Sequence, residues 1–153
     1  MILLESPSTQ MFLLPKFKNL FNRHTMQKPN PSVFIVDDEP LLNEMLTDYL
    51  LERYPGFHIQ TFPTGEDCLK CLNQEPDAVI LDYYLNSKEK GAANGIDILK
   101  EIKSQNKAIP VIMLSSQKSY GTASKTIMYG AIHYVVKGRD AFDEIFDLLK
   151  ANV

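Results

Sequence analysis

Residues 76–82 constrain the fold of this chain more than any other stretch. They read Pro-Asp-Ala-Val-Ile-Leu-Asp, which is a turn signal, a short run of aliphatic residues and a carboxylate. Such a run is too short for a core helix and is typical of a strand buried on both faces, as in parallel sheets. In open parallel sheets, ligands bind outside the carboxyl ends of the strands. Asp82 is therefore the first candidate for a functional residue.

A second run of the same kind lies earlier in the chain. Residues 33–36 are Val-Phe-Ile-Val, and the acid pair Asp37 and Asp38 follows them. Pro40 comes two residues later and is suited to the first turn of a helix. If the two strands are parallel neighbours, Asp37, Asp38 and Asp82 meet at one edge of the sheet.

From residue 33 onward, the pattern alternates between strands and helices. Pro55 and Gly56 end a helix in which apolar residues recur at helical spacing, at Leu42, Met45, Leu46, Tyr49 and Leu50. We predict a last helix that contains Phe142 and Leu149, further strands over residues 57–62, 109–114 and 132–136, and further helices over residues 64–73, 95–105 and 121–129. Five strands alternating with five helices predict an α/β fold with a parallel sheet, right-handed crossovers and helices on both faces.

The composition fits one globular domain that follows a different N-terminal segment. The 153 residues are 44% hydrophobic and 23% charged, which suits a single domain with a buried core. Residues 1–31 carry four basic residues and one acidic residue, whereas residues 32–153 carry twelve and eighteen. We expect the acidic domain, residues 32–153, to bind no nucleic acid.

Residues 1–31 are expected to form a mobile N-terminal extension. The alternative is a short amphipathic helix that docks on a membrane surface or a partner, with one face formed by Leu13, Phe17, Leu20 and Phe21. No apolar run reaches the ~20 residues that span a bilayer. Cys68 and Cys71 have helical spacing and lack a second Cys/His pair for zinc, so we expect reduced thiols in a cytoplasmic protein.

The residues just past the predicted strands form a chemically coherent set: Asp37, Asp38, Asp82, Ser115 and Lys137. Three neighbouring carboxylates repel one another, and oxygen-only ligands suit a divalent cation such as Mg²⁺ or Mn²⁺. A lysine ammonium binds phosphate, and a serine hydroxyl can hydrogen-bond a phosphoryl oxygen. A carboxylate held near a metal ion and a lysine can attack a phosphoryl donor and form an aspartyl-phosphate.

At these residues the sequence resembles the receiver domain of two-component response regulators, the family that includes the chemotaxis response regulator. The resemblance covers residues 32–153, and its motifs are residues 36–39, 80–85, 109–116 and 134–137. It implies a flavodoxin-like, doubly wound, five-stranded parallel sheet in the order 2-1-3-4-5. It also implies a phosphoprotein that receives its phosphoryl group from a histidine kinase or a histidine phosphotransfer protein and signals to a downstream protein target through a conformational change.

The same resemblance implies a phosphorylation and metal site. Asp82 would be the phosphoacceptor. Mg²⁺, or in its place Mn²⁺, would be held by Asp37, Asp38, Asp82 and the main-chain carbonyl of Tyr84. Lys137 would contact the phosphoryl group.

The resemblance further implies a switch and a dimer face. Ser115 would be the switch hydroxyl, and Tyr134 would turn inward on activation. Tyr84 and Gln117 stand at positions that tune dephosphorylation in the family. A homodimer would use the face formed by the fourth predicted helix, the fifth strand and the fifth helix.

Three features depart from the family's usual pattern. Gly138 follows Lys137 where the family usually has a proline, often after a cis bond. The turn over residues 86–94 is several residues longer than usual. No output domain follows Val153, so we expect a stand-alone receiver.

Two other readings remain open at this point. The domain could be an interaction module that is never phosphorylated. It could also be an enzyme that processes outside substrates through an aspartyl-phosphate, but the sequence offers neither an acid/base pair nor a substrate pocket for turnover. We therefore expect no enzyme activity beyond phosphorylation and dephosphorylation of the chain itself.

Overall fold

The computed structural model describes residues 28–85 and 94–153. The expectations for the N-terminal extension, and for most of the long turn after the third strand, fall on residues 1–27 and 86–93 and lie outside the described residues.

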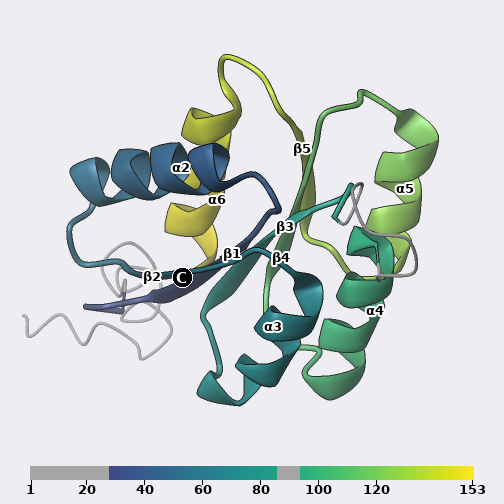
Figure 1. Cartoon of the computed structure of the whole chain (residues 1–153), viewed down its shortest axis with the longest axis horizontal. Coiled ribbons are helices and arrows are strands. Elements are labelled where there is room, and N and C mark those ends of the chain that lie inside the picture. Colours follow the sequence, from purple (N-terminus) through teal and green to yellow (C-terminus); the bar gives the residue numbers. More distant parts are fainter. Residues whose placement is uncertain (1–27, 86–93) are drawn as a thin grey trace, which may run out of the picture.

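A five-stranded parallel sheet forms the middle layer of the domain (Figure 1). Its strands are β1 (Ser32–Val36), β2 (His58–Phe62), β3 (Ala78–Asp82), β4 (Val111–Ser115) and β5 (His133–Val136). They lie in the order β2-β1-β3-β4-β5, and every neighbouring pair is parallel. The predicted α/β class and the doubly wound, flavodoxin-like strand order are confirmed.

Helices cover both faces of this sheet. They are α2 (Pro40–Arg53), α3 (Gly65–Lys70), α4 (Gly95–Gln105), α5 (Tyr120–Met128) and α6 (Ala141–Asn152), and a short 3₁₀ helix, η1 (Leu72–Gln74), follows α3. Figure 1 shows α2 and α6 on one face and α3, α4 and α5 on the other. In the described parts of the chain, no helix is both long enough and apolar enough to cross a bilayer.

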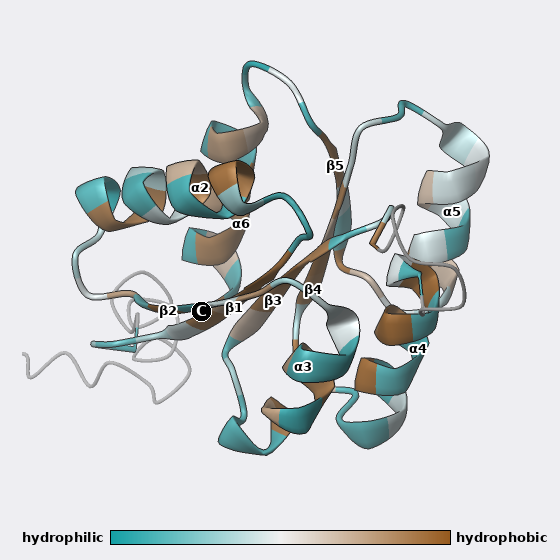
Figure 2. Cartoon of the chain, in the orientation of Figure 1, coloured by the Kyte–Doolittle hydropathy of each residue, from teal (hydrophilic) through white to brown (hydrophobic). Residues whose placement is uncertain are grey.

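The alternation of side chains along each strand builds two separate cores. In β1, Val33 and Ile35 pack against the α2 and α6 side, whereas Phe34 and Val36 pack against the α3 and α4 side. The central strand β3 is buried along its whole length, as expected for a strand covered on both faces. Figure 2 shows hydrophobic stretches along the inner strands β1, β3 and β4, between helices with mixed surfaces, whereas the edge strand β2 is more polar.

The predicted apolar face of α2 is wrong at one position. Leu46 and Leu50 are fully buried, but Met45 is 52% exposed. The buried position one turn before Leu46 is instead held by Asn43, at 8% exposure. The buried stripe of α2 is therefore narrower than the apolar pattern predicts, and it includes the amide side chain of Asn43.

Candidate functional site

Three carboxylates meet at the carboxyl edge of the sheet. Val36, the last residue of β1, pairs with Leu81 in β3, so the residues that follow them, Asp37 and Asp82, lie side by side. Carboxylate oxygens of Asp37, Asp38 and Asp82 lie within 4.8 Å of one another. The structure thus brings together the three acids that the sequence analysis selected.

Two of these carboxylates are almost fully buried. Asp37 is 1% exposed and Asp82 is 3% exposed. Burial raises the pKa of both groups, because the ionised form loses hydration. The pKa of Asp82 rises to about 6, with the charge of Asp37 adding to the effect of burial. Nearby cations and hydrogen-bond donors act in the opposite direction on both groups.

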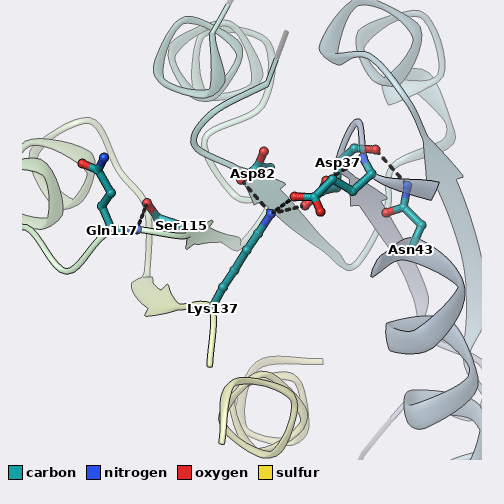
Figure 3. Close-up of polar contacts among 7 residues, drawn as sticks. Asp37, Asn43, Asp82, Ser115, Gln117 and Lys137 are labelled. Carbon is teal, nitrogen blue, oxygen red and sulfur yellow. Dashed lines mark hydrogen bonds and ion pairs between the residues drawn. The ribbon is translucent and has the colours of Figure 1, made fainter. Parts of the chain in front are cut away.

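Lys137 supplies positive charge to this site (Figure 3). From the end of β5 its Nζ atom reaches to 2.8 Å from Asp37 Oδ2, 3.1 Å from Glu39 Oε1 and 3.4 Å from Asp82 Oδ1. Burial alone would lower the pKa of the lysine, but the neighbouring carboxylates, Asp37 foremost, outweigh burial and raise it. Lys137 therefore carries its charge at neutral pH.

The Asp82 carboxylate is only partly satisfied. The main-chain N–H of Tyr84 donates a hydrogen bond to it and lowers its pKa, against the larger effect of burial. Its Oδ1 atom is buried and meets no full hydrogen-bond geometry within the described residues; its partner there is the Lys137 ammonium, in an ion pair of 3.4 Å. A buried carboxylate oxygen held by one long ion pair has capacity for a further partner, which a bound cation would supply.

The donor set fits a hard divalent cation. All three candidate ligands are carboxylates, and carboxylate oxygens suit Mg²⁺ and Mn²⁺. Such an ion would also offset the mutual repulsion of the acids.

A second group of polar contacts lies at the end of β4, beside the acids. Ser115 is fully buried, and its Oγ accepts a hydrogen bond from the main-chain N–H of Gln117 at 3.3 Å. The hydroxyl of Tyr84 donates to Oε1 of Gln117 at 2.7 Å, and the hydroxyl of Tyr134 donates to the Gln117 carbonyl at 2.8 Å. Gln117 thus joins three of the predicted functional residues through direct hydrogen bonds.

Main-chain contacts fix both strand ends next to the acids. The carbonyl of Ser115 accepts from the N–H of Lys137 at 2.7 Å, and no peptide bond in the described residues is cis, so the Lys137–Gly138 bond is trans. On the other side, the N–H of Gly95 donates to the Tyr83 carbonyl at 3.1 Å. A Cβ atom on Gly95 would lie 2.1 Å from the Asp82 carbonyl oxygen, so only glycine fits there.

Sequence reasoning missed two residues that contact the site. Glu39 pairs with Lys137, and its N–H donates to Asp37 Oδ1 at 2.9 Å. The side chain of Asn43 donates to the Asp37 carbonyl at 2.8 Å. One signal for Asn43 was available: the residue lies three positions before Leu46 and seven before Leu50, on the buried stripe of an otherwise apolar helix face.

Comparison with known proteins points to one family. The family model described as "Response regulator receiver domain" matches residues 33–150. The chain is 32% identical over 108 residues to the "Transcriptional regulatory protein MalR" of Bacillus subtilis (strain 168), which covers 69% of the chain and 43% of the relative. It is 33% identical over 107 residues to the "Probable transcriptional regulatory protein TcrX" of Mycobacterium tuberculosis (strain ATCC 25618 / H37Rv), with coverage of 69% and 43%. The matches span less than half the length of these relatives.

Solved structures show the same architecture. The "BeF3 Activated DrrB Receiver Domain" superposes with a TM-score of 0.65 at 25% identity, over 95% of its own length. The receiver domain of the Francisella response regulator 1452 gives a TM-score of 0.68 at 24% identity and covers 79% of this chain and 97% of its own. Because the family model matches most of the chain, and the fold and strand order agree, the chain belongs to the response regulator receiver domain family of two-component systems.

Proposed function

We propose that this domain accepts a phosphoryl group on Asp82, in a Mg²⁺-dependent reaction, from a histidine kinase or a histidine phosphotransfer protein. The observation that carries the proposal is the environment of Asp82. Its carboxylate is 3% exposed and lies beside two other acids, and its Oδ1 forms a 3.4 Å ion pair with the Lys137 ammonium.

Each of the chain's own groups has a defined task in this reaction. An ionised oxygen of Asp82 forms the new P–O bond, while the P–N bond to the donor histidine breaks and the imidazole keeps the bonding electrons. The ammonium of Lys137 lies 3.4 Å from Oδ1 of Asp82 and would attract the negative phosphoryl group. The pKa of about 6 leaves Asp82 ionised at neutral pH, as an attacking oxygen requires.

The carboxylates of Asp37, Asp38 and Asp82, and by family resemblance the Tyr84 carbonyl, would hold the cation. When bound, Mg²⁺ supplies charge neutralisation for the acids and for the phosphoryl oxygens. Mn²⁺ suits the same oxygen ligands.

The conformational response would run through Ser115 and Tyr134. A new phosphoryl oxygen would draw the Ser115 hydroxyl, which now accepts from the Gln117 N–H and also contacts the Tyr134 hydroxyl. Moving Gln117 would disturb the carbonyl that holds the Tyr134 hydroxyl, so the tyrosine would be released to turn inward. Tyr84 and Gln117, joined by their own hydrogen bond, would tune the rate of dephosphorylation.

The output would reach a downstream protein through the face of α5, β5 and α6. Large apolar side chains are exposed on α5 and just before β5, at Tyr120, Ile127, Met128 and Ile132. The same face would form a homodimer. We further propose cytoplasmic location, as for two-component signalling, and no turnover of outside substrates. The predicted stand-alone organisation stays a prediction, because the curated relatives are more than twice as long as the matched region.

The direct test is intact-mass measurement after incubation with acetyl phosphate and Mg²⁺. One phosphoryl group should be added to the wild-type domain and none to the Asp82→Asn variant. The Asp77→Asn variant, which changes an acid at the opposite end of β3, should be modified like the wild type. A wild-type protein that binds neither Mg²⁺ nor a phosphoryl group would favour a receiver-like interaction module, and sustained hydrolysis of a small phosphate ester would indicate an enzyme.

A further inference from the structure

Asn43 is a buried amide that contacts the acid site from the neighbouring helix. It lies in the first turns of α2, it is 8% exposed, and its Nδ2 donates to the Asp37 carbonyl at 2.8 Å (Figure 3). Its main-chain N–H donates to the Glu39 carbonyl at 3.2 Å. One residue of the helix thus holds both ends of the short loop that carries Asp38.

The other half of the Asn43 amide is unused. Its Oδ1 atom is buried and has no hydrogen-bond partner within the described ranges, 28–85 and 94–153. A buried acceptor without a donor lowers the stability of a fold, so an apolar side chain would suit this position better. The amide is therefore not explained by the stability of α2, whereas its donor half has a specific target in the acid loop.

The loop is held from three other directions, and none of them fixes the Asp37 carbonyl. The N–H of Asp37 donates to the Phe62 carbonyl at 3.1 Å. The Asp37 carboxylate accepts from the Glu39 N–H at 2.9 Å and pairs with Lys137 at 2.8 Å. The Asp37 carbonyl belongs to the peptide group between Asp37 and Asp38, so a hydrogen bond to this carbonyl restricts the rotation of that peptide. Asn43 donates this hydrogen bond.

We propose that Asn43 is a positioning residue for the cation site. By fixing the Asp37 carbonyl, it orients the Asp37–Asp38 peptide so that both carboxylates face Asp82, within the 4.8 Å that their oxygens span. Residues that orient metal ligands through hydrogen bonds typically change metal affinity by about 10- to 100-fold when they are replaced. The inference rests on the proposed function in that the ligand is taken to be Mg²⁺.

The test compares Asn43→Leu with the matched control Thr47→Val. Thr47 lies one turn further along α2, its Oγ1 is also buried without a partner in the described residues, and both residues line the same pocket of about 440 Å³. No hydrogen bond joins Thr47 to residues 37–39 in that part of the chain. The pocket gives the larger leucine side chain room. Both variants remove one unpaired polar atom, but only Asn43→Leu removes the donor to Asp37.

Mg²⁺ affinity is measured by NMR titration and stability by urea unfolding. Asn43→Leu should raise the Mg²⁺ Kd by about tenfold or more while the urea transition shows a folded domain, and Thr47→Val should leave the Kd unchanged. If leucine proves too large for the fold, the same Kd increase is expected for Asn43→Ser, because the serine side chain is too short to reach the Asp37 carbonyl. A Kd equal to that of the wild type in the folded variant would overturn the inference.

A second readout needs no metal. The Glu39 N–H donates to Asp37 Oδ1, so it is protected from exchange only while Asp37 is held in place. In metal-free protein, the amide proton of Glu39 should therefore exchange faster in Asn43→Leu than in Thr47→Val. If the wild type fails to bind Mg²⁺, the proposed function is wrong, and this exchange rate still decides the role of Asn43. Equal protection of Glu39 in the two variants would show that the loop holds its shape without the amide.

Discussion

The Nζ atom of Lys137 lies 2.8 Å from Oδ2 of Asp37, a residue 100 positions away in the chain. The same nitrogen lies 3.4 Å from Asp82, so one cation compensates two buried carboxylates. Breaking such a pair by removing one partner leaves the other charges buried and uncompensated. The lysine is therefore important for the stability of the metal-free domain, in addition to the phosphate contact that we propose for it.

Replacing Lys137 with methionine should destabilise the metal-free domain. The loss should be about 3 kcal/mol near neutral pH, because the buried carboxylates of Asp37 and Asp82 lose their cationic partner. Below pH 6, where Asp82 becomes protonated, the loss should shrink. Urea unfolding in EDTA at several pH values measures this difference, with the exposed Lys118→Met as control. A penalty that stays constant across this pH range would contradict the proposed pairing.

Replacing Asp82 with asparagine should stabilise the metal-free domain at neutral pH. The pKa of Asp82 is raised from 3.8 to about 6, so the folded state binds this proton more tightly than the unfolded state does. The wild type is therefore penalised above pH 6, by about 3 kcal/mol, and regains that stability as the pH falls toward 4. The variant has no such proton to bind, so its advantage should disappear at low pH. Urea unfolding in EDTA checks this, and a less stable variant at neutral pH would contradict the direction of the pKa shift.

Replacing Asp38 with alanine should weaken Mg²⁺ binding by at least about tenfold, because one of three carboxylate ligands is lost. The control is Asp48→Ala, which removes an acid from α2 outside the cluster. NMR titration with Mg²⁺ gives both dissociation constants. Equal Mg²⁺ affinity in the two variants would show that Asp38 is not a ligand of the ion.

Replacing Ser115 with alanine should separate phosphorylation from its readout. The variant keeps the main-chain bond from the Lys137 N–H to residue 115, so the strand ends should stay in place. It should still accept a phosphoryl group on Asp82, but the chemical shifts of α5, β5 and α6 should change less per phosphoryl group bound. A response equal to that of the wild type would show that the switch runs through other residues.

The sheet and the acid cluster could be predicted because strand patterns determine both. Aliphatic runs that end in a polar residue identify buried parallel strands, and the topology then brings Asp37 and Asp82 to one edge. Element ends were less accurate: β5 begins at His133 rather than Ile132, and η1 replaces the end of the helix predicted over residues 64–73.

The contacts around the acids could not be predicted from periodicity. Whether Glu39 reaches Lys137 depends on rotamers, and the two residues are 98 positions apart in the chain. The predicted burial of Met45 was wrong for a related reason. An apolar residue at helical spacing can lie outside the stripe of the helix that neighbouring elements cover. Asn43 was overlooked because a single amide interrupts an apolar pattern without changing its period.

The hydrogen bond from Gly95 to the Tyr83 carbonyl joins the two ends of the segment between β3 and α4. Because these ends are held together beside Asp82, adding residues between them mainly changes the entropy of loop closure, which grows by only ~0.6 kcal/mol for each doubling of length. Residues can therefore be added between these ends without shifting Asp82. The segment between Tyr83 and Gly95 is thus a suitable place to insert a reporter peptide near the carboxylates of Asp37, Asp38 and Asp82, because the sheet would keep its register.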